Sequence, residues 1–139
     1  MPPVVRGACT PIEFNAATSV IIVDTVGVQD GDILLFFMNS SEATTDISPF
    51  PDAGWVNSTR LTGAGKAGEM AYKLSASGEG ASWTFGWSGS HAGIATVIVI
   101  DGSTVDNTLS GTPAGQQTAA GTTHATPNIT TDEDNALRS

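Results

Sequence analysis

The sequence feature that most constrains the fold is a run of six large apolar residues at positions 33–38, between an acidic turn and a polar stop. Residues 30–32 are Asp-Gly-Asp and residues 39–41 are Asn-Ser-Ser. Six residues suit a β-strand and are too few for a buried helix, and the turn residues on both sides also favour a strand. Because a strand that is apolar on both faces is covered on both sides, we predict that residues 33–38 form the central core strand of a two-layer β domain.

The composition agrees with an all-β domain. The chain has 139 residues, which is the size of one domain, and 40% of them are hydrophobic, which is enough for a core. Its 16 Gly and 7 Pro suit short strands and tight turns better than helices. We therefore expect an antiparallel β-sandwich with extended arms at both ends.

Apolar and β-branched runs locate the other strands. The run at residues 94–100 is the expected partner of residues 33–38, in the same sheet or across the sandwich. Residues 27–32 form a short connection, which predicts that the strands on either side of it are antiparallel neighbours. The remaining expected strands are residues 12–14, 19–26, 55–61, 69–74 and 82–87, with residues 124–131 as a final edge strand.

Two of these strands alternate with a period of two. Met70, Tyr72 and Leu74 alternate with Ala71 and Lys73, which predicts one face turned inward and one turned to solvent. Trp83, Phe85 and Trp87 share one face of the later strand. Three aromatic side chains on one face suit either a core or a platform for sugar stacking, and we favour the core because the chain has few other aromatic residues to fill one.

The ends and the long loop are the expected places for contacts with other molecules. Residues 1–11 contain three prolines, which predicts an extended arm or an edge strand; residues 12–102 form the sandwich core; and residues 103–139 are a Ser/Thr/Gly-rich extended segment. The polar loop at 39–54 carries Phe50 between two prolines. Phe50 either folds back onto the sandwich or contacts another subunit.

Charge and cysteine content exclude several classes of function. The formal net charge is −9, which disfavours nucleic acid and anionic membrane surfaces as partners. Cys9 is the single cysteine, so it forms no internal disulfide, and we expect it to be a small buried residue. The N-terminus lacks a signal-peptide pattern and no apolar run reaches the length of a membrane helix, so we expect a soluble protein made in a cytoplasm.

No motif predicts catalysis. Ser90 and His91 are only sequence neighbours, and the glycine-rich residues 63–68 lack the Ser or Thr and the helix that a phosphate-binding loop needs, so we expect a hairpin loop there. Loop carboxylates at Asp30, Asp32, Asp101 and Asp106 are the kind of ligand that calcium takes, but without EF-hand spacing we favour solvated turn aspartates. We expect no enzyme activity, no cofactor and no metal.

Four ordered motifs carry a resemblance. Residues 31–35 (Gly-Asp-Ile-Leu-Leu), Gly54-Trp55, residues 71–73 (Ala-Tyr-Lys) and residues 83–85 (Trp-Thr-Phe), followed by the apolar strand at 94–100, resemble a family of small phage virion proteins encoded among head and tail genes. The resemblance covers residues 12–135. Many relatives continue with further strands after the segment that matches 129–137, so we expect either a shorter fold or a sheet completed by a neighbouring subunit.

The resemblance implies a jelly-roll-type sandwich and a structural role on the virion, without catalytic residues. The leading expectation is a capsid decoration protein that binds the major capsid protein or other virion proteins as a homo-oligomer, with a trimer favoured. The alternative is a tail or fibre module that binds a carbohydrate or a host receptor through an exposed tryptophan. The expected interface residues are Pro2, Pro3, Val4, Val5, Arg6, Phe50, Pro127 and Ile129.

Overall fold

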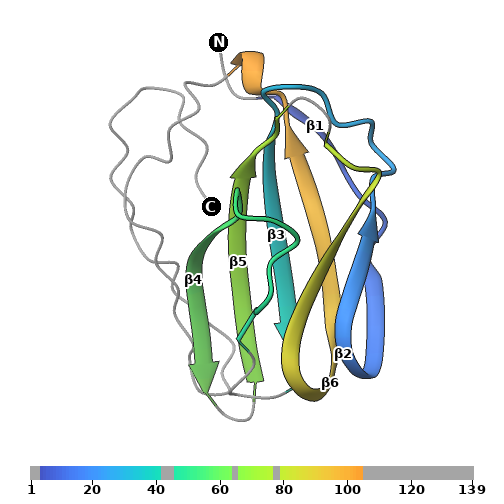
Figure 1. The fold of residues 1–139 in the computed structure, drawn as a ribbon, viewed down its shortest axis with the longest axis vertical. Coiled ribbons are helices and arrows are strands. Elements are labelled where there is room, and N and C mark those ends of the chain that lie inside the picture. The colour runs from blue at the N-terminus through green and yellow to red at the C-terminus, as the bar shows by residue number, and fades with distance from the viewer. Residues whose placement is uncertain (1–3, 42–45, 64–65, 77–78, 105–139) are drawn as a thin grey trace, which may run out of the picture.

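The computed structural model describes residues 4–41, 46–63, 66–76 and 79–104, and in these residues the chain is all-β (Figure 1). The strands form one antiparallel sheet, and a single 3-10 turn, Gly102–Thr104, follows the last of them. The all-β antiparallel prediction is confirmed, whereas the sandwich and jelly-roll assignments stay predictions. The strands are β1 (Val5–Ala8), β2 (Ile12–Val23), β3 (Ile33–Ser40), β4 (Val56–Gly63), β5 (Lys66–Leu74) and β6 (Ser82–Ile100).

The predicted central strand is at the centre of the sheet. The strand order is β1-β6-β3-β5-β4, and β2 also pairs with β6. All eight residues of β3 pair with β5 on one side and with the second half of β6 on the other, from Ile33 to Ser40. The apolar run at 94–100 is therefore the neighbour of β3 in the same sheet, one of the two predicted arrangements.

Strands β2 and β6 form a long two-stranded ribbon that folds back on itself. In Figure 1, β6 runs down as a yellow band, turns at the bottom and returns as an orange arrow. The bend coincides with positive φ angles at Ala16 (48°) and Gly89 (84°) and with two register shifts in the β2–β6 pairing. The predicted turn at 88–93 is thus a bend inside one strand, and the two strands predicted at 12–14 and 19–26 are a single strand.

The prediction that the strands flanking residues 27–32 are neighbours is wrong. The second half of β2 pairs with the first half of β6, in the folded-back part of the ribbon, whereas β3 pairs with the second half of β6. The connection therefore crosses between two parts of the fold. Asp24 stabilises it, because its carboxylate accepts hydrogen bonds of 2.8–2.9 Å from the backbone N–H groups of Val26, Gly27 and Val28.

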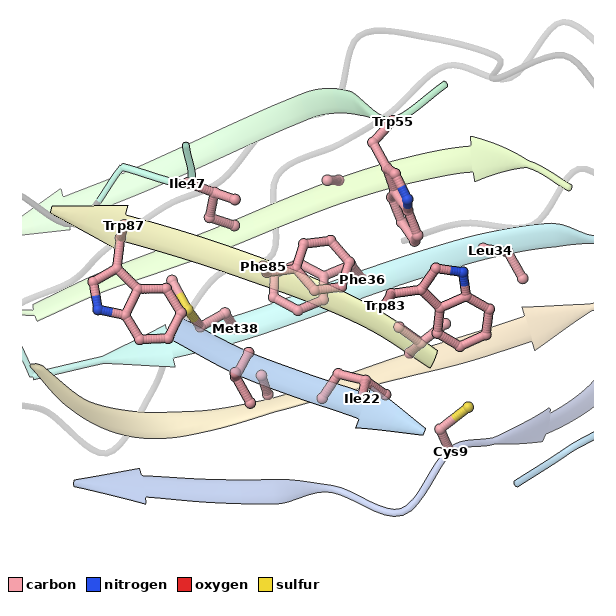
Figure 2. Close-up of a cluster of buried hydrophobic side chains, with 14 of the residues drawn as sticks. Cys9, Ile22, Leu34, Phe36, Met38, Ile47, Trp55, Trp83, Phe85 and Trp87 are labelled. Atoms are coloured by element: carbon pink, nitrogen blue, oxygen red, sulfur yellow. The ribbon is translucent and has the colours of Figure 1, made fainter. Parts of the chain in front are cut away.

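The core lies between the folded-back ribbon and the inner face of the sheet. Phe85 on the first half of β6 stacks on Phe36 of β3, with ring centroids 3.8 Å apart (Figure 2). Trp55 packs edge-on against Phe85 and Trp83. Trp83, Phe85 and Trp87 are all buried, which confirms the prediction that they form the core, and Cys9 is fully buried as expected.

The hairpin between β4 and β5 confirms the interpretation of the glycine-rich segment. Strand β4 ends at Gly63, β5 begins at Lys66, and these two residues pair directly. A strand, and no helix, follows Lys66, so this segment has none of the geometry that holds a phosphate at a helix N-terminus.

Candidate functional site

The most buried charged side chain of the described residues, Asp32, links both ends of the described chain to the central strand. A bulge in β1 lets Arg6 turn toward Asp32, where its Nε and Nη2 atoms each donate a 2.9 Å hydrogen bond to the carboxylate. Asp32 is 1% exposed and also accepts from the backbone N–H groups of Gln29, at 2.9 Å, and Gly102, at 3.4 Å. Asp101 lies 3.4 Å from Arg6. This cluster joins β1, β3 and the end of β6.

The surroundings of Asp32 keep it ionised. Burial alone would raise the pKa of its carboxyl group, but the hydrogen bonds from Arg6, Gln29 and Gly102 outweigh burial and lower it. Arg6 lies between Asp32 and Asp101, and its positive charge offsets the repulsion between the two carboxylates that a bound cation would otherwise have to offset. Within the described ranges, no group of three or more His, Cys, Asp or Glu side chains could hold a metal ion, and Asp106 lies outside those ranges.

A second charged cluster surrounds Lys73 of β5, which is buried, although its partner Asp52 is exposed. Its ammonium group lies 2.6 Å from Asp52 and 2.9 Å from Glu79, and Glu79 also accepts a 2.7 Å hydrogen bond from the indole N–H of Trp83. Burial would lower the pKa of Lys73, but the two carboxylates outweigh burial and raise it. Lys73 is therefore a charged anchor for two loops rather than a nucleophile.

The positions of Glu69, Ala71 and Lys73 show which face of β5 is buried, which the alternation alone left open. These three residues are buried on the inner face, while Leu74 is 49% exposed on the outer face. The alternation itself is correctly predicted. The sequence does not reveal that Lys73 meets Asp52 and Glu79, because these partners come from two separate loops.

The other residues with reactive groups are held by internal contacts. His91 Nε2 lies 2.9 Å from the carbonyl oxygen of Ser88, and the indole N–H of Trp87 donates to the carbonyl of Ala17. Burial raises the pKa of the Cys9 thiol, which keeps it protonated and unreactive. These three side chains contribute contacts within the fold, and the candidate site that remains is a surface.

Several of the expected interface residues have defined positions. Val4 and Val5 are about half exposed, whereas Arg6 is engaged with Asp32. Phe50 takes the folded-back alternative, because it packs against the core and lies edge-on to Phe85 at 6.4 Å. Pro2, Pro3, Pro127 and Ile129 lie outside the described residues, as do the segment 105–139 and its predicted edge strand.

The main candidate surface is the face of the sheet opposite the core, turned away from the folded-back part of the ribbon in which the second half of β2 pairs with the first half of β6. We call it the outer face. Cross-strand pairing aligns its side chains in rows: Val5, Ile100, Ile33 and Leu74 form one row, and Ile98, Leu35, Tyr72 and Val56 form the next. Phe37, Met70 and Ile94 extend the apolar surface toward the other end. Among the described side chains of this face, the one charge is Glu13, which pairs with Ile94 at a corner.

The rim of the outer face is open. Val5, Val56, Leu74 and Ile94 are 43–51% exposed, which is high for large apolar side chains arranged on one sheet. Toward the middle of the face Leu35 and Ile100 are only 9% and 3% exposed. The described loops at 24–32 and 46–55 place Val26, Val28 and Phe50 against the core, on the other side of the sheet.

Comparisons of the chain with protein-family models, with curated proteins and with solved structures found no match. The resemblance to phage virion proteins therefore stays a prediction. No helix in the described part of the chain is long and apolar enough to cross a membrane.

Proposed function

We propose that this protein is a non-enzymatic structural protein of a phage virion, a capsid decoration protein that binds the major capsid protein or another virion protein. The observation that carries the proposal is the outer face. A broad surface with almost no charge and large apolar side chains is a surface for contact with protein.

The positions of the resemblance motifs support a structural role for them. In the motif at 31–35, Asp32 accepts the buried hydrogen bonds that join β1, β3 and β6. Lys73, in the motif at 71–73, anchors two loops. Trp55 and Trp83, in two further motifs, pack edge-on in the core. Each motif thus contributes to folding, as expected of a family defined by a scaffold rather than by a reaction.

The alternative is a tail or fibre module that binds a carbohydrate or a receptor. That alternative requires an exposed tryptophan. Trp55, Trp83 and Trp87 are 2–5% exposed and lie in the core, so none of them offers a ring for sugar stacking. This favours the decoration role.

The test is cosedimentation with capsids assembled from the major capsid protein encoded in the same genome. We expect the purified chain to pellet with the capsids and to saturate at a fixed ratio to the capsid subunits. Failure to bind capsids or any other virion protein would overturn the proposal, and selective retention on a glycan array would establish the alternative.

A further inference from the structure

We propose that the outer face is the surface through which two copies of this chain associate, face to face about a two-fold axis. The inference deepens the proposed function and rests on it for the structural role of the protein. It names one occupant of the face, a second copy, and one mode of contact, the packing of sheet on sheet.

The first argument is the orientation of β5. This strand turns Met70, Tyr72 and Leu74 outward, while Lys73 and Glu69 are buried. Lys73 and Glu69 have polar partners in the core, but on the other side of the strand the large apolar side chains are partly exposed to water, which is unfavourable. The arrangement becomes favourable when the outer side chains are also removed from water, so the sheet acts as the middle layer of a larger assembly.

The second argument concerns which molecule can cover the face. Residues 105–139 follow the last described turn, but these 35 residues contain only Val105, Leu109, Ile129 and Leu137 as large apolar residues. These four residues are fewer than the eleven side chains of the two rows and their extension. A second copy supplies the same number of apolar side chains in the same layout, and a two-fold axis makes one surface complementary to itself.

The third argument is size. Strands β6, β3, β5 and β4, with β1 and the first residues of β2 together forming a fifth row beside β6, lie about 4.8 Å apart. With roughly eight residues per row they give a face of about 20 Å by 26 Å, or about 500 Å² per copy in flat projection. Two such faces present roughly 1,000 Å² in flat projection, which is about the lower size limit of a specific interface, and the half-exposed side chains at the rim supply most of the area that contact would remove from water. The stacked sheets would lie about 10 Å apart.

The experiment measures molar mass by light scattering and sedimentation on the full chain over a concentration series. We expect a dimer that dissociates in the micromolar range. The test variant carries Val5→Glu and Leu74→Glu, which lie at the two ends of one row and are 51% and 49% exposed. Each copy then brings two carboxylates into an apolar contact, and we expect the dissociation constant to rise roughly 100-fold or more.

The matched control carries Ile21→Glu and Val23→Glu on the ribbon. These side chains are 55% and 51% exposed, so the charge change, the number of sites and the exposure are alike. We expect the control to dimerise like the unchanged chain, and circular dichroism with thermal unfolding to show all three chains folded.

The outcomes separate this inference from the proposed function. A monomeric unchanged chain at every concentration, a trimeric mass, or equal effects of the two double substitutions would each overturn the face-to-face dimer. A dimer that binds no virion protein would leave this inference standing and remove the proposed function. A monomer that still binds capsids would overturn the face-to-face dimer and leave the proposed function standing.

Discussion

At the scale of single residues, Asp32 illustrates how a turn residue becomes a structural centre. Its carboxylate accepts two hydrogen bonds from Arg6 and further ones from the backbone of Gln29 and Gly102. We expect Asp32→Asn to lower the free energy of unfolding by about 2 kcal/mol at neutral pH, because charge-assisted hydrogen bonds are lost. Urea denaturation measures the change, and the exposed neighbour substitution Asp30→Asn, expected to stay within about 0.5 kcal/mol, is the control.

The pH dependence of this difference has a definite sign. The pKa of Asp32 is lower in the folded chain than its ordinary value of about 3.9, so its contribution is complete above that value. The contribution is lost as the pH falls through the folded pKa. The stability difference between the unchanged chain and Asp32→Asn should therefore shrink below about pH 4. A difference that grows on acidification would contradict the ion pair.

The close approach of β6 to β3 makes Gly93 a second residue on which stability depends. Gly93 of β6 faces β3, and a Cβ added there would collide with the carbonyl oxygen of Asn39 and the ring of Phe14. We expect Gly93→Ala to destabilise the fold by roughly 3 kcal/mol, because the obstacle is partly backbone and cannot rotate away. Gly68→Ala, where the nearest atom is 4.0 Å from the added carbon, should cost less than about 1 kcal/mol. Equal losses at the two sites would contradict the close approach.

At the scale of elements, the sequence predicts local patterns well and long-range placement poorly. Residues 33–38 are predicted as the central strand because both faces are apolar, and β3 has that position. The continuous β6 is missed because Gly89 and its neighbours have the composition of a turn, and only pairing with β2 keeps them in a strand. The orientation of β5 is missed because alternation defines two faces without saying which is buried, and the loop partners of Lys73 decide it.

The candidate surface is likewise only partly predictable. Val5, among the expected interface residues, lies at the rim of the outer face, but Phe50 packs against the core. The rows of the outer face depend on the register between β1, β6, β3 and β5, which no local pattern specifies. The apolar character of both faces of residues 33–38 is the one sequence feature that points to a covered outer side.

The folded-back ribbon gives a prediction for a whole element. Phe85 holds the first half of β6 on the sheet through its stacking on Phe36. We expect Phe85→Ala to destabilise the fold by about 3–5 kcal/mol, since it leaves a cavity between ribbon and sheet. Val23→Ala, at a half-exposed site on the same ribbon, should change stability by less than about 0.5 kcal/mol.

Tryptophan fluorescence during denaturation measures this effect, because Trp83 and Trp87 lie on the same strand as Phe85 and are buried. Emission should be blue-shifted and protected from acrylamide in the native state. Emission already at the wavelength of exposed tryptophan in the unchanged chain would contradict the docking of the ribbon.

At the scale of the whole molecule, charge and apolar surface act in opposite directions on association. Each copy has a net charge of −9, while the outer face carries a single described charge at one corner. Two like-charged copies repel at a distance, and salt screens that repulsion over about 10 Å at 0.1 M without weakening apolar contact. We therefore expect the dimer to become tighter, by roughly 3- to 10-fold, when salt is raised from about 0.02 to 0.5 M.

Sedimentation at several salt concentrations measures the dissociation constant of the dimer. The Ile21→Glu, Val23→Glu control should show a steeper dependence on salt, because it adds two negative charges per copy away from the contact. An association held by ion pairs would instead weaken as salt rises, and that result would place the contact on the charged surfaces and not on the outer face.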